Sequence, residues 1–246
     1  MVNLTGEEVT GMSKKAIGII GGMGPEATLD LFGKVIRHTD ASCDAEHIRV
    51  YIDCHTGIPD RTRAILEGGE SPVPYIVESA EKLAAMGADF LLLPCNTSHY
   101  YYDDIAARSP VPVVNMIRTA AEELRRCGVR RVGVLATDGT LRSGVYQKEL
   151  NACGIEAICP EGAEQAAVMS LIYDGIKANA PTFDIAPVER VLAHLRDAGA
   201  ERLVLGCTEL PVAVARYGIH APDALDATDV LARAAVAMAG YPVKNF

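Results

Sequence analysis

Short apolar runs alternate along the chain with longer stretches in which apolar residues recur every three or four positions. The apolar runs lie at 16–20, 47–52, 89–93, 111–114, 131–135, 155–158 and 202–205. Runs of this length, bounded by polar or Gly/Pro positions, predict strands. The longer stretches at 76–86, 117–127 and 188–198 have the periodicity of amphipathic helices. Strands that alternate with helices predict an α/β fold with mostly parallel sheets.

The pattern occurs twice. The segment "KKAIGIIGGMGPEAT" (14–28) is echoed by "VRRVGVLATDGTLRS" (129–143), and "MGADFLLLPCNT" (86–97) by "AGAERLVLGCTE" (198–209). The two pairs are offset by 115 and 112 residues. This repeat predicts two similar α/β domains related by a pseudo-twofold axis. Because ligands bind beyond the carboxyl ends of parallel strands, the active site is expected in the cleft between the domains.

The repeat also suggests where the domains begin and end. We expect residues 13–112 together with 221–246 to form the first domain, and 113–220 the second. A helix predicted at 226–240 would return to pack on the first domain. Residues 1–12 are polar and acidic, without the apolar segment of a signal peptide. They are predicted to be a disordered leader, with Met12 as the natural start.

Composition excludes several classes of protein. The chain has 246 residues and a net charge of −9, and its Lys and Arg residues form no blocks, so no nucleic-acid partner is expected. No apolar run approaches the roughly 18 residues of a membrane span. The seven cysteines are odd in number and contain no C-x-x-C motif. They predict reduced thiols in a cytoplasmic protein, with neither a disulfide framework nor a metal site.

Two of these thiols stand at equivalent places. Cys95 and Cys207 each follow an apolar strand in the second repeated segment. A buried cysteine commonly packs as a small hydrophobe, which would explain either residue alone but not the matched placement. Two thiols facing one carbon atom from opposite sides could remove and return a proton with inversion. Covalent thiol chemistry is the other possibility.

At this point four segments resemble a known family. They are "GIIGGMGPEAT" (18–28), "IPDRT" (58–62), "PCNTSHY" (94–100) and "LGCTELP" (205–211). Together they resemble the aspartate/glutamate racemase family, with the aspartate racemase branch most similar. The resemblance implies a cofactor-independent amino-acid racemase, with Cys95 and Cys207 as the acid/base pair. It also implies a small dicarboxylic amino-acid substrate and a homodimer. Glu209 stands where glutamate racemases usually carry His, and "DCHTG" before IPDRT departs from the family pattern, which leaves the side-chain preference open.

Polar residues after the strands are candidates for binding the substrate. Asn96, Thr97 and Thr208 follow the thiols, where they could hold a carboxylate, cap a helix, or do both. Glu209 could cap a helix, orient a neighbour or contact the substrate ammonium. Further candidates come from the two Gly-containing loops: the backbone of Met23 and Gly24 in the first, and the hydroxyl of Thr137 in the second.

Two cations are selected by the family resemblance alone. They are Arg61 in "IPDRT" and Lys177 in "LIYDGIKAN". An Arg fork matches a carboxylate, and an acidic protein needs local positive charge to hold a dicarboxylic acid. Without the resemblance both would be read as ordinary surface cations. His99, four residues after Cys95, could tune that thiol or simply pack in the core.

Other functions remain open. Gly22, Gly24 and Ala27, with Asp53 at the end of the next strand, form a weak dinucleotide fingerprint. Pro25 opposes it, since proline lacks an N–H that the pyrophosphate would use. A cysteine-dependent dicarboxylate isomerase or decarboxylase on the same scaffold is one alternative. A non-catalytic amino-acid or nucleotide-binding module is another.

Overall fold

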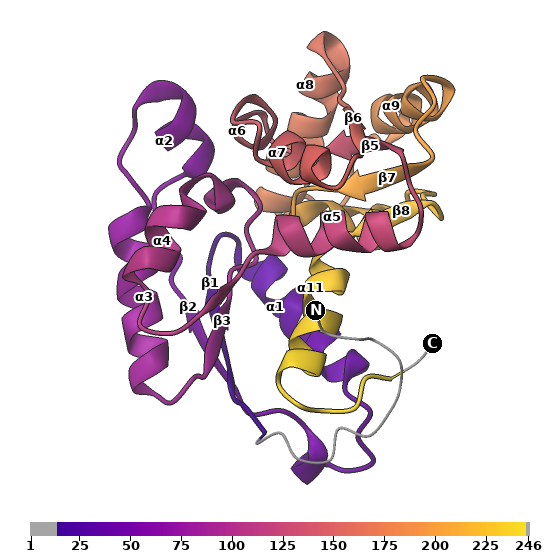
Figure 1. The fold of residues 1–246 in the computed structure, drawn as a ribbon. Coiled ribbons are helices and arrows are strands. Elements are labelled where there is room, and N and C mark those ends of the chain that lie inside the picture. The colour runs from indigo at the N-terminus through magenta and orange to yellow at the C-terminus, as the bar shows by residue number, and fades with distance from the viewer. Residues whose placement is uncertain (1–13, 245–246) are drawn as a thin grey trace.

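The computed structural model describes residues 14–244 and contains two four-stranded sheets, each from one half of the chain (Figure 1). The first sheet is formed by β1 (Ile17–Gly21), β2 (Val50–Cys54), β3 (Phe90–Leu92) and β4 (Val113–Val114). The second is formed by β5 (Arg131–Leu135), β6 (Glu156–Ile158), β7 (Arg202–Leu205) and β8 (Ala224–Asp226). All pairings within both sheets are parallel, so the predicted α/β fold with two similar sheets is confirmed.

The strands of the two sheets are arranged in the same order. It is β2-β1-β3-β4 in the first sheet and β6-β5-β7-β8 in the second. In both, the chain moves to one side of the first strand and then crosses to its other side. The direction therefore switches between the first and third strands, which is where open parallel sheets bind ligands.

A pair of glycines shows that the repeat extends to side-chain packing. A Cβ at Gly18 in β1 would lie 2.5 Å from the Leu91 side chain of β3. A Cβ at Gly133 in β5 would lie 2.7 Å from Leu203 of β7. In each half the missing side chain leaves room for the leucine on the neighbouring strand.

Helices surround both sheets. In the first half they are α1 (Pro25–His38), η1 (Asp44–Glu46), α2 (Arg61–Glu67), α3 (Val73–Ala85), η2 (Thr97–Tyr101) and α4 (Tyr102–Arg108). After β4, the last strand of the first sheet, they are α5 (Met116–Arg126), α6 (Asp138–Arg142), α7 (Val145–Ala152), α8 (Gly162–Ser170), the π-helix η3 (Leu171–Lys177), α9 (Ala186–Asp197), α10 (Glu209–Tyr217) and α11 (Ala227–Met238). None of the helices in the described part of the chain is long and apolar enough to cross a membrane.

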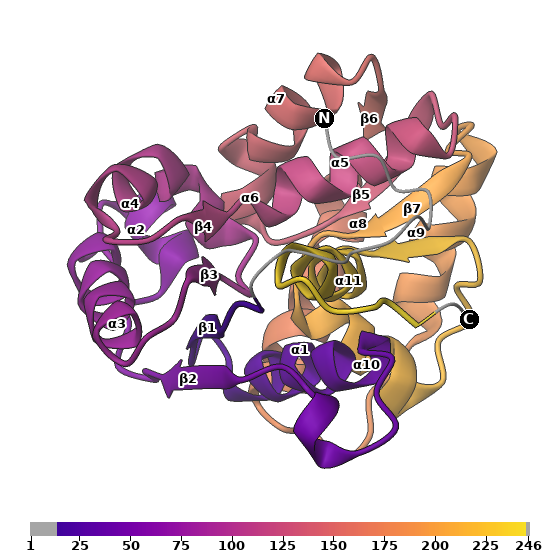
Figure 2. The same ribbon diagram turned by 60° about the horizontal axis from the view of Figure 1, so that its bottom comes forward.

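The C-terminal helix joins the two halves. The sequence predicted it at 226–240, and α11 occupies Ala227–Met238. Figure 2 shows it between α1 and the second sheet. Leu231 and Val236 of α11 share one buried cluster with Leu31 and Val35 of α1. One continuous core therefore links the beginning of the described chain to its end.

The sequence did not predict β8. It is a three-residue, half-buried strand that pairs with β7 in the second sheet, although it lies within 221–246, the segment assigned to the first domain. The domain boundaries stay a prediction, and the proposed leader at 1–12 lies outside the described residues.

Candidate active site

The loops after the first and third strands of both sheets meet at one cavity. Ten of the eleven predicted site residues line it: Met23, Arg61, Cys95, Asn96, Thr97, Thr137, Lys177, Cys207, Thr208 and Glu209. The eleventh, Gly24, lies beside it, because a Cβ there would be 3.5 Å from Glu209 Oε1. Asp60, Thr62 and Tyr173 also line the cavity.

Both predicted thiols are buried in the wall of this cavity. Cys95 is 5% exposed and Cys207 is 6% exposed, and all seven cysteines are free. Each thiol follows the third strand of its sheet, β3 or β7. The equivalent placement inferred from the repeat therefore brings the two sulfurs to one site from opposite halves of the molecule.

Cys207 is held as a proton donor. Its Sγ–H donates to Glu209 Oε2 at 3.0 Å, while Lys177 Nζ donates to Glu209 Oε1 at 2.7 Å. The pKa of the Cys207 thiol lies well above its ordinary value. Burial is the main cause and the charge of Glu209 adds to it, whereas Lys177 acts in the opposite direction. Of the three roles left open for Glu209, this geometry favours orienting a neighbour, since it contacts the thiol and Lys177 together.

Replacing Glu209 by glutamine should lower the pKa of Cys207. The substitution removes a negative charge beside the thiol and leaves the positive charge of Lys177, and both changes favour the thiolate. The difference between the ultraviolet thiolate titrations of each protein and its Cys207→Ser derivative isolates this group. Its midpoint should move to lower pH in Glu209→Gln. Glu161→Gln, outside the cavity, serves as the control; an unmoved midpoint in Glu209→Gln would contradict the assignment.

Arg61 is buried beside Cys95. Its Nη1 donates to the carbonyl of Pro59 (2.9 Å) and its Nη2 to that of Met23 (3.0 Å), while Nε has no partner among the described residues. Burial lowers the pKa of Arg61, but Cys95 and nearby carboxylates outweigh it and the pKa is raised. The guanidinium therefore remains charged next to the first thiol, and its Nε–H is an unused donor among the described residues.

His99 packs rather than titrates near neutral pH. It is buried, its Nε2 accepts from the Met116 N–H (3.0 Å), and Nδ1 therefore carries the proton that it donates to the Cys95 carbonyl (2.9 Å). Burial is the main cause that lowers its pKa to about 4. This neutral ring ties the carbonyl of Cys95 to the first residue of α5.

His99 should make the fold sensitive to acid. Its unfolded pKa is about 6.5, so between pH 6.5 and 4 the unfolded chain binds a proton that the folded chain does not. The free energy of unfolding should fall by about 3 kcal/mol as pH falls through this window, with no further loss from this group below it. Urea titrations at several pH values should show a smaller slope for His99→Gln. The exposed His194→Gln should retain the wild-type slope, and an identical slope in all three proteins would refute the account.

Three hydroxyls join the halves above the cavity. The Oγ1 atoms of Thr97, Thr137 and Thr140 lie 2.9 to 3.0 Å from one another. Beside them, a Cβ at Gly139 would lie 2.9 Å from Thr62 Cα. The first turn of α6 is therefore in direct contact with α2, and this glycine permits the close approach.

Tyr173 makes a second contact between the two halves of the chain. Its hydroxyl donates to Asp60 Oδ2 at 3.1 Å. With these contacts made, the cavity has a volume of about 10 Å³. A single water needs roughly 10–15 Å³, so the cavity in this structure is too small to hold an amino acid.

The sequence missed three residues of the cavity wall. Asp60 and Thr62 flank Arg61, and Tyr173 lies four positions before Lys177. Tyr173 and Lys177 lie four positions apart in the π-helix η3, a spacing that puts them on one face. Only proximity to a predicted residue could have indicated these three residues. Thr140 is fully buried behind the cavity, where its side chain completes the hydroxyl cluster.

The Gly-containing loop after β1 offers little to a dinucleotide. The Gly22 N–H is already donated to Thr28 Oγ1 at 2.9 Å, and Pro25 occupies the first position of α1. Two of the groups that would face a pyrophosphate are thus unavailable. Among the described residues, no group of three or more His, Cys, Asp or Glu is arranged to hold a metal ion.

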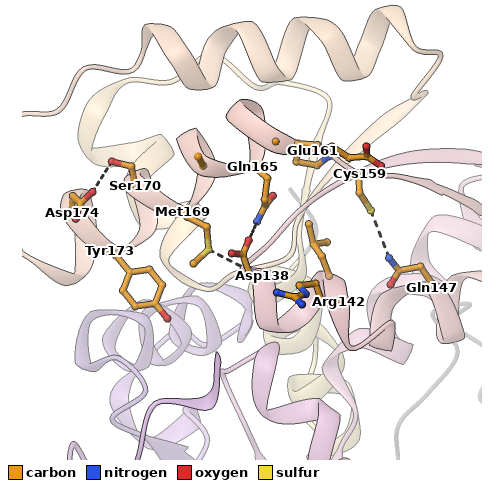
Figure 3. Close-up of a pocket in the computed structure, with 14 residues that line it drawn as sticks. Asp138, Arg142, Gln147, Cys159, Glu161, Gln165, Met169, Ser170, Tyr173 and Asp174 are labelled. Carbon is orange, nitrogen blue, oxygen red and sulfur yellow. Dashed lines mark hydrogen bonds between the residues drawn. The ribbon is translucent and has the colours of Figure 1, made fainter. Parts of the chain in front are cut away.

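A larger cavity of about 790 Å³ adjoins the first, with Tyr173 in the wall of both (Figure 3). Gln165 donates to Asp138 and Ser170 donates to Asp174 along its wall (Figure 3). The one cysteine in its wall is Cys159, and burial is the main cause that raises the pKa of this thiol. This cavity lacks the thiol pair and the buried cation, so the smaller one is the candidate active site.

Matching parallel sheets around a cavity with two thiols define a class of two-domain α/β enzymes, and sequence comparison names it. Residues 20–235 match the Asp/Glu/Hydantoin racemase family, and the chain belongs to this family. The resemblance inferred from the motifs is therefore confirmed.

Individual relatives agree with the family. The chain is 35% identical over 156 residues to the broad specificity amino-acid racemase RacX of Bacillus subtilis, a stretch covering 61% of this chain and 66% of RacX. A glutamate racemase of Aquifex aeolicus is 32% identical over 58% of this chain and 55% of its own. The structure of Picrophilus torridus aspartate racemase superimposes with a TM-score of 0.80, at 32% identity over 94% of this chain and 96% of that one. These matched proteins are amino-acid racemases, which are isomerases.

Proposed function

We propose that the chain is a cofactor-independent amino-acid racemase that interconverts L- and D-aspartate, with glutamate as the second dicarboxylic substrate to test. The observation that carries this proposal is the pair of buried thiols that reach one cavity from equivalent loops of two matching sheets. Two such groups, one on each face of Cα, can remove a proton from one face and return a proton to the other.

The hydrogen bond between Cys207 and Glu209 suggests how one turnover begins. Cys207 is the donor in this bond and would be the acid in this form. Cys95, as the thiolate, would take the Cα proton, and the electron pair left on Cα would take the proton of Cys207. The product leaves with inverted configuration, Cys95 as thiol and Cys207 as thiolate. The reverse reaction begins from that second form.

One cation in the cavity wall supports an acidic substrate. Lys177 is already paired with Glu209, whereas Arg61 forms no ion pair among the described residues and its Nε has no partner there. The similarity to aspartate and glutamate racemases supports the same class of substrate, whereas the similarity to RacX argues for assaying a wider panel. The proposal also includes that the protein forms a homodimer and acts in the cytoplasm.

A chiral assay tests this function. Purified protein without added pyridoxal phosphate is incubated separately with L- and D-aspartate, L- and D-glutamate and a panel of neutral and basic amino acids. We expect aspartate to approach a racemic mixture from either side, with solvent deuterium at Cα in D₂O. Absence of inversion and exchange for every amino acid would refute the proposal. A thioether adduct with an unsaturated dicarboxylate would instead favour the isomerase alternative.

A further inference from the structure

Tyr146 is a fully buried residue of α7 that contacts the loops of both thiols. Its ring is 0% exposed, and its hydroxyl donates to Asn96 Oδ1 at 2.7 Å across the boundary between the halves. Asn96 directly follows Cys95. The hydrogen bond therefore links the second half of the chain to the loop of the first thiol.

The same ring packs against the loop of the second thiol. A Cβ at Gly206 would lie 3.0 Å from Tyr146 Cε2, and Gly206 directly precedes Cys207. Glycine at this place leaves room for the ring. The pKa of Tyr146 is raised, chiefly by burial and also by Cys207, so the phenol keeps its proton and remains a donor.

A phenol that donates determines which way the Asn96 amide faces. The amide has one oxygen acceptor and one NH₂ donor group, and Tyr146 occupies the oxygen. Asn96 lines the catalytic cavity, and its Nδ2 is buried and has no partner among the described residues. Without the phenol, the two ends of the amide could exchange places.

We propose that Tyr146 is a positioning residue that holds the Asn96 amide with its NH₂ group toward the substrate carboxylate. The proposal rests on the proposed function for the identity of the ligand. It rests on geometry alone for the orientation of the amide. Losing the phenol would leave Asn96 in place but let its oxygen turn toward the carboxylate, where it would repel rather than bind.

Kinetics of Tyr146→Phe test the part that depends on turnover. We expect KM for both aspartate enantiomers to rise roughly fivefold to tenfold, the effect of about one hydrogen bond, with kcat changed less than KM. Tyr217→Phe removes a hydroxyl that donates to the Ala180 carbonyl outside the cavity and should leave both constants unchanged. In an Asn96→Ala background, Tyr146→Phe should have no further effect on KM. An unchanged KM in Tyr146→Phe, or full additivity with Asn96→Ala, would overturn the proposal while leaving the racemase function standing.

Nuclear magnetic resonance tests the orientation without turnover. The side-chain amide signals of Asn96, assigned by their loss in Asn96→Ala, should shift or broaden in Tyr146→Phe and stay unchanged in Tyr217→Phe. Unperturbed signals in Tyr146→Phe would overturn the positioning role even if no amino acid proved to be a substrate. Failure of the chiral assay with perturbed signals would count against the proposed function alone.

Discussion

Replacing either Cys95 or Cys207 by serine should lower the racemisation rate by about a thousandfold or more. Loss of a positioned acid or base costs about 10²- to 10⁴-fold, and here each turnover needs both groups. Cys159→Ser is the control. It alters a partly buried thiol in the larger, adjoining cavity and should remain active. Chiral chromatography of aspartate after incubation measures the loss.

Hydrogen exchange in the same variants distinguishes a two-base reaction from general damage. A protein with one thiol can still remove a proton from the enantiomer that faces it, but it cannot deliver one to the opposite side. Residual exchange with D₂O should therefore be confined to one enantiomer in Cys95→Ser and to the other in Cys207→Ser. Wild-type inversion in both variants, or exchange of the same enantiomer in both, would exclude the pair as the acid and base.

Gly139→Ala should lower kcat/KM by on the order of 10- to 100-fold while the fold is kept. The new Cβ would stand 2.9 Å from Thr62 Cα and 3.1 Å from Thr97 Cγ2. A backbone atom cannot rotate away as the end of a side chain can, so α6 and α2 must move apart. Reacting groups on the two halves then no longer reach the separation that the chemistry needs.

Gly33→Ala is the matched control, because it makes the same substitution within a helix. At Gly33 the new Cβ would meet only the flexible end of Arg37, at 3.3 Å. Alanine favours a helix over glycine by up to about 1 kcal/mol, so this variant should keep its activity with an equal or higher melting temperature. Full activity of Gly139→Ala would show that the close approach is not required for turnover.

The repeat explains why so much of the site could be predicted. Cys95 and Cys207 each follow the third strand of their sheet in a similar sequence context, and the carboxyl ends of parallel strands necessarily meet at one edge. Arg61 and Lys177 were reached only through family resemblance, because nothing local distinguishes them from solvated cations. Their place in the wall of the cavity depends on how the two halves face each other, a relation that no local pattern contains.

The missed features share a physical cause. Tyr146 contacts Asn96 across 50 residues of sequence, so neither residue carries a sign of the other. The strand β8 consists of three half-buried residues and owes its conformation to pairing with β7. The π-helix η3 has the composition of an ordinary helix. Each of these depends on tertiary contacts that outweigh local propensity.

The position of α11 has a consequence for biosynthesis. Leu31 and Val35 of α1 are covered in the finished molecule by Leu231 and Val236, which the ribosome adds some two hundred residues later. Domains commonly fold in the order in which they are made, and apolar surface exposed in the meantime invites aggregation. The nascent first half therefore keeps this apolar surface of α1 exposed until α11 has been made, and its folding is completed only when that helix packs onto it.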